Sequence, residues 1–421
     1  MTRLPLRRAL LPVAVLSALA LAGCSSSTPS GASSSGGADT GPLTVWVMGD
    51  SAKNFDQLVA PFTTQTGIKV TTVAIPWDSI DQKMTTAVAS GQGPDVVQIG
   101  LSKLRTFADT GALLPLDDAT LAGYPNLAAS RFLPGIAGNA TAVGGKVVSV
   151  PWISDTRVLF YRTDLLSAAG ISEPPATWDQ LRADAKKLAG RGSGQYGYYI
   201  PQWDSALPVQ MTWAYGGDIV DPSGAVDFGT DAFSKAVDLY TGLYADGSVP
   251  TASDFDQTQG FVSGSTPMVV SGPYLAAAIK QSAPDLDGKW AVAQLPKAST
   301  STALLAGSNL GVWGKSAHQT AALKLLDFLA QKDTQLSWYT INGDLPTVTE
   351  ALSDPSLTSD PLVKVYAASL ASAKILPLVP NWDGATGKAL LDALNSIALQ
   401  GTDKSAAIAT LESATKGQSV N

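Results

Sequence analysis

The sequence predicts an α/β protein in which helices flank mostly parallel β-sheets. From Leu43 onward, short apolar stretches rich in β-branched residues alternate with stretches of helical periodicity, and the helical stretches repeatedly stop at glycine. Alternation of strands and helices is typical of parallel sheets. Roughly 380 of the 421 residues follow Leu43, and a folded part of this length indicates two domains.

The N-terminal residues carry export signals. Three arginines within the first eight residues precede an apolar run over 9–22, which is too short for an ordinary membrane span and indicates a secretory signal over 1–23. Leu-Ala-Gly-Cys at 21–24 resembles the lipobox of bacterial lipoproteins, in which the chain is cut before the cysteine and its thiol carries a diacylglycerol. The alternative is that Cys24, the one cysteine of the chain, is an incidental residue of the signal. The Ser/Gly-rich stretch 24–42 predicts a flexible tether.

Residues 43–111 predict three strand and helix pairs. The strands are expected over 43–49, 68–76 and 94–100, and the helices over 55–62, 77–91 and 101–111.

Polar residues follow two of these strands, where a parallel sheet opens a crevice between strand ends and helix starts. Asp50 follows the first strand, and Gln98 and Ser102 lie at the end of the third. We therefore expect these side chains to face a ligand. The alternative for Asp50 is a role as helix N-cap.

The middle of the chain predicts crossings between two domains. A strand that ends at Pro151-Trp152 is followed almost at once by a second strand over 158–162. A Ser/Thr-rich segment at 298–313 predicts a second crossing. The remaining elements are expected as helices over 177–188, 231–244 and 320–330, strands over 197–201, 266–274 and 289–296, and a last helical stretch ending near Lys416.

Composition excludes several classes of function. One histidine, one cysteine and three glutamates leave nothing for a histidine-based catalytic triad or a His/Cys zinc site. The net charge of -7 and the isoelectric point near 4.8 disfavour nucleic acid as a partner. Aromatic residues are plentiful instead, with ten tryptophans and eleven tyrosines. We expect no metal and no cofactor.

Motifs across nearly the whole mature chain resemble one family. They are WVMGD at 46–50, GQGPDVVQIG at 91–100, VPWISDTRVLFYRTDLL at 150–166, TWAYGGD at 212–218, PMVVSGPY at 267–274, GSNLGVW at 307–313 and LPLVPNW at 376–382. In their order and spacing they are similar to family 1 extracellular solute-binding proteins of bacterial ABC importers, the sugar-binding type related to maltose-binding protein.

The resemblance implies an architecture and a function. The fold would be two-lobed and periplasmic-binding-protein-like (type II), each lobe a mostly parallel sheet flanked by helices, joined by a hinge of several segments. The expected lobes are 43–152 plus 304–344, and 153–303 plus 345–421. The protein would be a monomer, anchored through the lipid on Cys24 to the extracellular face of the bacterial membrane. It would capture a sugar between its lobes and deliver it to permease subunits served by a separate ATPase.

Sugar recognition requires aromatic faces for the CH surfaces of a pyranose and Asp, Asn, Gln or Arg for its hydroxyls. Several aromatic residues neighbour Gly, Pro or Asp, as expected near a site, although each has core packing as its alternative. In the family, Asp50 falls on the sugar-binding acid of the first loop, Asp155 on the acid after the first hinge crossing, and Tyr274 on a stacking position. The predicted ligand-binding residues are Asp50, Gln98, Ser102, Trp152, Asp155, Arg157, Trp203, Trp213, Tyr215, Tyr274, Asn309 and Trp382.

This sequence departs from the maltose binders at two places, because Ser51 replaces their first-loop basic residue and Ser102-Lys103 replaces an acidic-basic pair. The resemblance therefore leaves the kind of sugar open.

Two other classes of protein are weighed against a binding protein. A glycoside hydrolase needs two carboxyl groups flanking a sugar, which the aspartates could supply, but the chain has few glutamates and no local acid pair. An adhesion or scaffold protein would be expected to contain repeats, and none is found. The GxGxxG spelling at 192–197 follows a predicted helix and precedes a predicted strand, the reverse of a dinucleotide site, and indicates a loop.

Overall fold

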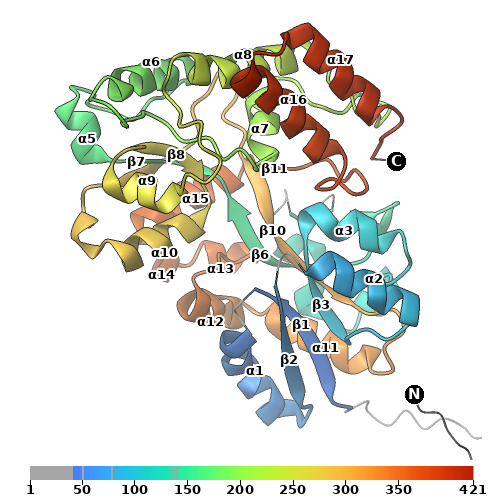
Figure 1. Ribbon diagram of the computed structural model, residues 1–421. Coiled ribbons are helices and arrows are strands. Elements are labelled where there is room, and N and C mark those ends of the chain that lie inside the picture. Colours follow the sequence, from blue (N-terminus) through green and yellow to red (C-terminus); the bar gives the residue numbers. More distant parts are fainter. Residues whose placement is uncertain (1–40, 50–51, 77–78, 134–135, 139–140, 421) are drawn as a thin grey trace, which may run out of the picture. The chain divides into compact units, whose positions relative to one another are not determined.

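The computed structural model describes residues 41–49, 52–76, 79–133, 136–138 and 141–420, and Figure 1 shows its ribbon. The predicted signal, Cys24, nearly all of the predicted tether, and Asp50 lie outside the described residues.

Helices make up most of the regular structure. They are α1 (Ala52–Thr66), α2 (Ile80–Ser90), α3 (Leu101–Ala108), α4 (Asp118–Leu121), α5 (Thr163–Ala168), α6 (Trp178–Ala189), α7 (Ala206–Ala214), α8 (Asp231–Ala245), α9 (Gln257–Ser263), α10 (Pro273–Ser282), α11 (Gln319–Leu329), α12 (Lys332–Asn342), α13 (Thr349–Leu352), α14 (Pro355–Thr358), α15 (Pro361–Leu370), α16 (Thr386–Gln400) and α17 (Lys404–Thr415). Three short 3-10 turns cover Pro125–Leu127, Ala129–Arg131 and Pro284–Leu286. In the part of the chain that the structure describes, none of the helices is both long and apolar enough to cross a membrane.

The strands form two main sheets and a small hairpin. They are β1 (Leu43–Met48), β2 (Val70–Ile75), β3 (Val96–Gly100), β4 (Ala142–Val143), β5 (Lys146–Val147), β6 (Val150–Thr156), β7 (Val158–Tyr161), β8 (Met268–Ser271), β9 (Ala291–Ala293), β10 (Leu304–Val312) and β11 (Lys374–Ile375).

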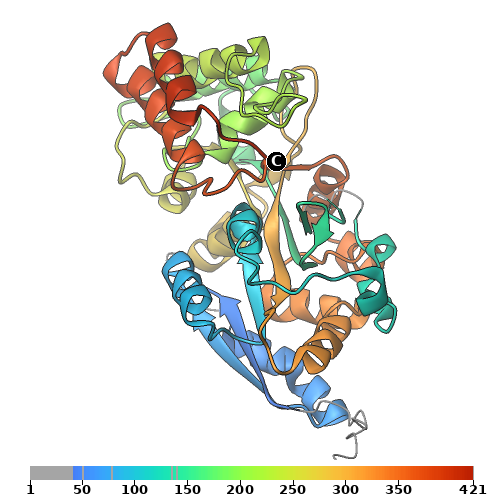
Figure 2. The ribbon, with the colours of Figure 1, turned by 90° about the vertical axis from the view of Figure 1, so that its right-hand side faces the viewer.

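The first sheet has the order β11-β10-β3-β1-β2, with β6 paired to β10. Strands β1, β2 and β3 are parallel, which confirms the prediction from strand and helix alternation. Every residue of β3 is buried, as expected of a central strand that is covered on both faces. Strand β10 runs antiparallel to β3 and to β6. Both β6 and β10 can be followed through the centre of Figure 2.

The second sheet differs from the predicted parallel arrangement. Its order is β8-β7-β9, and β7 is antiparallel to both neighbours. Strands β8 and β9 therefore share one direction, as expected for strands joined through helix α10, but β7 is inserted between them. Strand β7 reaches this sheet directly from β6 of the first sheet, without a helical connection, and it runs opposite to both of its neighbours. The prediction of a mostly parallel sheet in each lobe is wrong for this sheet.

The predicted strand over 197–201 is also wrong. This segment forms a single bridge, between Tyr199 and Val269. The backbone N–H groups of Gly197 and Tyr198 both donate to the carbonyl of Ser248 instead of to a strand. Pro201 has no N–H to extend a ladder.

The apolar core is divided, and β10 contributes to more than one part of it. Leu310 and Val312 pack in a cluster with Leu43, Phe55 and other residues around the first sheet. Leu304, at the other end of the same strand, packs in a cluster with residues of α7, α8 and α16. One continuous strand thus connects two hydrophobic cores, and the site lies along it.

Candidate ligand-binding cleft

Two cavities meet at Gly307 of β10 and together form a cleft. The first has a volume of about 550 Å³ and the second about 680 Å³. Gly307 is the residue that lines both. Its φ of +121° is open to glycine, and a Cβ atom there would lie 2.1 Å from the carbonyl oxygen of Ile153. Glycine therefore allows β10 to approach β6 closely at the centre of the cleft.

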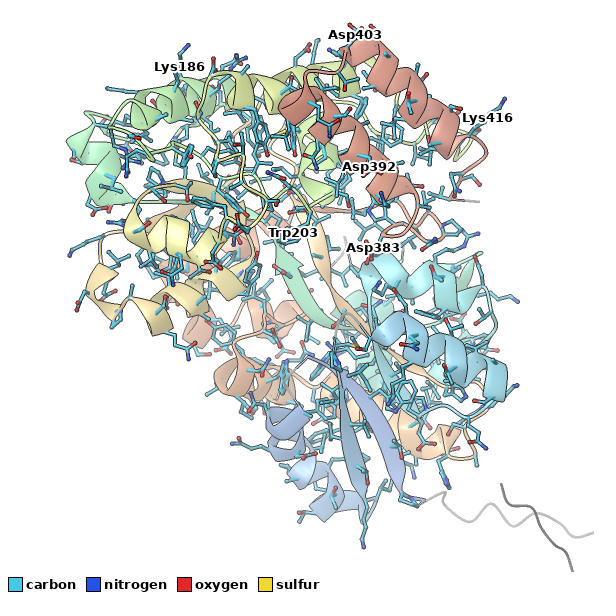
Figure 3. All side chains as sticks on the ribbon, in the orientation of Figure 1. Lys186, Trp203, Asp383, Asp392, Asp403 and Lys416 are labelled. Carbon is cyan, nitrogen blue, oxygen red and sulfur yellow. The ribbon has the colours of Figure 1, made fainter. Side chains whose placement is uncertain are left out.

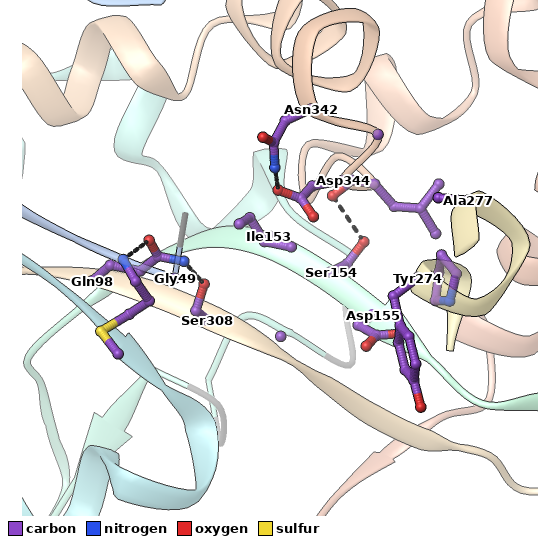
Figure 4. Close-up of a pocket in the computed structure, with 15 residues that line it drawn as sticks. Gly49, Gln98, Ile153, Ser154, Asp155, Tyr274, Ala277, Ser308, Asn342 and Asp344 are labelled. Carbon is purple, nitrogen blue, oxygen red and sulfur yellow. Dashed lines mark hydrogen bonds between the residues drawn. The ribbon is translucent and has the colours of Figure 1, made fainter. Parts of the chain in front are cut away.

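The first cavity lies at the carboxyl ends of β1 and β3, as predicted from the parallel sheet. Gln98, at the end of β3, is buried and fixed by two hydrogen bonds. Its Oε1 accepts from the backbone N–H of Met48 at 2.9 Å, and its Nε2 donates to Ser308 Oγ at 2.7 Å. Figure 4 shows this pair at one side of the cavity. These bonds tie β1, β3 and β10 together beneath the ligand space.

Asp155 projects from the end of β6 into the same cavity. Its Oδ1 is buried and has no hydrogen-bond partner. The carboxyl lies against Gly272, where a Cβ would come within 2.8 Å of Oδ1. Burial raises the pKa of Asp155 to about 6, with opposition from the charge of Arg157 and reinforcement from Asp344.

Tyr274 stands beside Asp155 in the first turn of α10. Gly272 precedes this helix and Pro273 opens it, a sequence suited to a helix start. The ring of Tyr274 is 47% exposed. Its hydroxyl accepts from Gln257 Nε2 at 3.3 Å.

Asp344 completes the polar wall, just after α12. The helix ends at Gly343, which adopts the left-handed conformation with φ 82°, a common helix ending. Asp344 Oδ2 accepts from Asn342 Nδ2 at 2.6 Å and from Trp338 Nε1 at 3.0 Å. Burial raises the pKa of Asp344 although these hydrogen bonds oppose the shift.

The second cavity carries basic as well as acidic groups. Arg157 Nη1 lies 3.7 Å from Asp204 Oδ2, and both side chains are largely buried. Burial opposes the charge of Arg157, but Asp204 and Asp155 outweigh it and hold the pKa of the guanidinium above its ordinary value. Lys103 Nζ lies 3.1 Å from Asp383 Oδ2, and Ser102 Oγ donates to the same oxygen at 3.3 Å.

Trp203 lines the second cavity and is 64% exposed. Figure 3 labels it together with Asp383. Trp203 and Tyr274 are the two aromatic side chains that stand out as exposed among the described residues. Each lines one half of the cleft.

The cleft brings together six of the twelve predicted site residues. Gln98, Asp155 and Tyr274 line the first cavity, and Ser102, Arg157 and Trp203 line the second.

Five other predicted site residues do not line either cavity. Trp152 is buried and contacts Phe55 and Trp338. Trp213 and Trp382 are buried, with indole N–H groups that donate to Asp218 and Ser205. Tyr215 packs against the core, and the amide of buried Asn309 donates to Ser149 Oγ.

Sequence reasoning left out several residues that line the cleft. These are Lys103, Asp204, Ser308, Asn342, Asp344 and Asp383. Asp204 and Asp383 directly follow the predicted site residues Trp203 and Trp382, and Asn342 and Asp344 flank Gly343 shortly before Pro346. A search for polar residues next to these signals would have found them.

The arrangement offers hydrogen-bonding groups and aromatic faces. In the described ranges no group of three or more His, Cys, Asp or Glu side chains could hold a metal ion. Two α/β parts connected by β6 and β10, with a polar cleft along these strands, define a two-lobed binding protein.

Residues 48–336 match the family described as bacterial extracellular solute-binding protein, and the chain belongs to this family. It is a binding protein of the ABC-transporter type and not an enzyme, so the glycoside hydrolase alternative is not favoured.

Solved structures and curated relatives agree with this assignment. The sugar-binding protein MalE from Xanthomonas citri has a TM-score of 0.82 and 28% identity, over 89% of this chain and 96% of that chain. The GacH receptor of Streptomyces glaucescens, solved unliganded and with acarbose, has a TM-score of 0.79 and 25% identity, over 90% and 99% of the two chains. The diacetylchitobiose binding protein DasA of Streptomyces coelicolor is 27% identical, over 81% of this chain and 80% of its own length.

Proposed function

We propose that this protein captures a saccharide in the cleft and delivers it to an ABC permease, whose ATPase is a separate protein. The observation that carries the proposal is the placement of Trp203 and Tyr274. Each is an exposed aromatic side chain, each lines one of the two cavities that meet at Gly307, and each neighbours a carboxylate.

These side chains match the chemistry of a pyranose ring. The CH faces of the ring are apolar and pack on aromatic side chains, while its hydroxyls both donate and accept hydrogen bonds. Asp155 and Asp344 offer acceptors in one half of the cleft, and Arg157 offers donors in the other. Buried sugar hydroxyls would thus find partners, which they need in a desolvated site.

The names of similar proteins support a carbohydrate ligand. MalE is described as sugar-binding, GacH was solved with acarbose, and DasA is named for diacetylchitobiose. Asp50 also belongs to the proposed site, on the strength of its position in the sequence alone.

We propose lobes of 43–152 plus 304–344 and of 153–303 plus 345–421. The hinge would comprise Trp152–Arg157, Leu295–Ala303 and Asn342–Pro346. Strand β10 supports a division into two lobes because its two ends pack in different apolar clusters, with Leu304 packed against residues of the second proposed lobe. The bridge between Ser154 and Leu345 supports it too, because it joins two of the proposed hinge segments.

The proposal includes a lipid anchor on Cys24 and a monomer at the extracellular face of the membrane. The lipobox-like sequence supports the anchor, and one diacyl group would supply the main membrane attachment. The variant Cys24→Ala is expected to release the protein from membranes in a fractionation experiment. A variant that stays bound to membranes would contradict the anchor.

The saccharide site is tested by calorimetry. Thermal shift against mono-, di- and trisaccharides first selects a ligand, because a ligand at 100 times its dissociation constant adds about 2.7 kcal/mol of stability. Trp203→Ala and Tyr274→Ala should then each weaken binding at least tenfold, because stacking contributes about 0.5–1.5 kcal/mol beyond the buried area. Since both rings are exposed in the unliganded protein, its melting temperature should change little.

Trp382→Ala is the matched control for these variants. Its side chain is 1% exposed and its indole N–H donates to Ser205, so truncation should lower stability by about 3–5 kcal/mol. Weaker binding without a loss of stability would instead place Trp382 in the site. If no saccharide binds to the wild type, or if oligosaccharides are hydrolysed, the proposed function is overturned.

A further inference from the structure

The two halves of the cleft differ in charge. The lining of the first cavity contains the carboxylates Asp155 and Asp344 and, in the part of the chain that the structure describes, no lysine, arginine or histidine. The second cavity contains Lys103 and Arg157 together with Asp204 and Asp383. Because each of these cations lies near one of these acids, the second half is balanced and the first is negative.

Asp155 has no partner for one of its carboxylate oxygens. Oδ1 is buried without a hydrogen bond, although it lies at the edge of a cavity large enough for a sugar. The charge of Arg157 acts on this carboxylate from nearby, but the guanidinium forms its ion pair with Asp204, in the other half of the cleft. An unpaired buried carboxylate is unfavourable, and a positively charged donor would relieve it.

Asp344 brings a second negative charge to the same space. Only its Oδ2 receives the hydrogen bonds of Asn342 and Trp338. The donors are neutral, so the charge is not compensated. Burial raises the pKa of both Asp155 and Asp344, and the charge of Arg157 opposes the shift of Asp155 without cancelling it.

The exposed ring of Tyr274 would attract a cation as well. It lies next to the Asp155 carboxyl, since a Cβ at Gly272 would be 2.8 Å from Asp155 Oδ1 and 3.2 Å from Tyr274 Cδ1. The face of an aromatic ring attracts cations as well as apolar CH groups. Two carboxylates and a ring face suit an ammonium group on a sugar better than a bare metal ion, because Ca²⁺ takes six to eight oxygen ligands.

We propose that the solute is an amino sugar whose protonated amine occupies the first cavity, between Asp155, Asp344 and Tyr274. This inference rests on the proposed function and narrows its substrate class. The amine would donate to the free oxygen of Asp155 and to Asp344, and the ring carbons would pack on Tyr274. The second cavity, with its paired cations and carboxylates, would hold the rest of the molecule against Trp203.

Three disaccharides with the same β-1,4 linkage test the inference by calorimetry near pH 7. They are chitobiose with free amines, cellobiose with hydroxyls in their place, and diacetylchitobiose with neutral amides. Chitobiose should bind at least tenfold more tightly than either of the others. Equal or tighter binding of cellobiose or diacetylchitobiose would overturn the amine and leave the saccharide site intact. Failure of every saccharide to bind would overturn the proposed function itself.

Two variants locate the amine. Asp155→Asn and Asp344→Asn keep the size of the side chain and remove its charge. Each should weaken chitobiose binding about tenfold more than it weakens cellobiose binding, because cellobiose loses an acceptor but no charge pair. An equal loss for both sugars would contradict the inference, because a carboxylate that only accepts from hydroxyls serves both. Melting temperatures verify that each variant is folded.

The matched control is Asp392→Asn. Asp392 lies on α16, away from the cleft lining, and pairs with Lys388 at 2.6 Å in an exposed ion pair. The Asp392→Asn variant removes one negative charge, as the two cleft variants do, but at a site outside the cleft. It should therefore leave the preference for chitobiose unchanged. A loss of preference in this variant would mean that long-range charge, and not the cavity, selects the amine.

The pH dependence should follow the groups around Asp155. Arg157, Asp204 and Asp344 act on it, and Tyr366 responds to its charge. Because the pKa of Asp155 is raised to about 6, protonation below that pH removes the negative charge. Chitobiose binding should weaken at least threefold from pH 7 to pH 5, and cellobiose binding should weaken less. A flat profile for chitobiose would contradict the role of Asp155.

Discussion

The carboxyl of Asp155 lies against Gly272 with one oxygen buried and unpaired, and its charge opposes folding in the absence of ligand. The pKa is about 6 in the folded protein, compared with about 3.9 for an unperturbed aspartate. Between these two values the folded protein binds more protons than the unfolded chain. The contribution of Asp155 to stability therefore improves as the pH falls from about 7 to about 4.

Asp155→Asn should accordingly stabilise the unliganded protein at pH 7, by about 1–3 kcal/mol, because it removes this unfavourable charge. The advantage should shrink as the pH falls through 6 and should be nearly absent near pH 4. Urea unfolding of both proteins at several pH values measures it. A difference that is independent of pH would show that Asp155 does not titrate in this range.

Single residues also mark the limit of prediction from the sequence. Trp152 and Trp203 both neighbour a Pro or Asp at a turn, yet Trp152 packs between Phe55 and Trp338 whereas Trp203 is 64% exposed. The neighbouring residues therefore do not distinguish the buried tryptophan from the exposed one. What separates them is whether distant segments, here α1 and α12, cover the ring, and such contacts are not written in the neighbouring residues.

At the level of elements, β10 owes its position to Gly307. A side chain at this residue would meet the backbone oxygen of Ile153, which cannot rotate away as a flexible side chain would. Gly67 offers a comparison, because it also has a positive φ, 73°, but a Cβ atom at Gly67 would have nothing within 4 Å. Substitution of Gly67 would therefore test the strain of a positive φ alone, whereas substitution of Gly307 would add a clash with the backbone of Ile153.

We expect Gly67→Ala to lower stability by about 1–2 kcal/mol through the left-handed conformation alone. Gly307→Ala should lower it by more than that, because β6 and β10 must also move apart. Denaturant unfolding provides both values, and calorimetry should show weaker ligand binding for Gly307→Ala alone. Equal effects of the two variants on stability and binding would contradict the clash.

The elements themselves were predictable where their signals are local. The first three strands and helices follow from alternating patterns and glycine stops, and the residues after β3 lie at the cleft as the parallel sheet predicts. The direction of β7 was not predictable in this way, because it depends on the short connection from β6 and on pairing with β8, more than a hundred residues later. The cleft residue Asp344 depends on a similar long-range pairing, between Ser154 and Leu345.

At the scale of the whole molecule, polar contacts tie α3 to the C-terminal segments at and beside the second cavity. Lys103 pairs with Asp383, the N–H of Asn381 donates to Thr106 Oγ1 at 3.2 Å, and Arg105 donates to the carbonyl of Val420. These polar contacts involve short connections at the surface. They can break and reform as rigid bodies rotate, whereas the apolar clusters resist deformation.

Ligand should therefore bring the proposed lobes together as rigid bodies about the hinge. Small-angle scattering with saturating saccharide should give a smaller radius of gyration than the unliganded protein. Circular dichroism should remain unchanged, because closure requires no new folding. The same radius with and without a ligand whose binding has been verified by calorimetry would contradict closure.

The position of β10 in the first sheet also means that this sheet cannot be completed until late in synthesis. Its partner β3 ends at Gly100, but β10 begins only at Leu304, about two hundred residues later. At the usual elongation rate of about 5–20 residues per second, roughly 10–40 s pass before the ribosome supplies the missing strand. Throughout this interval β3 has an unpaired, apolar edge of the kind that promotes aggregation. A nascent chain of this design benefits from being kept unfolded by a chaperone until synthesis is complete, which is also the state in which a chain can be threaded through a secretion channel.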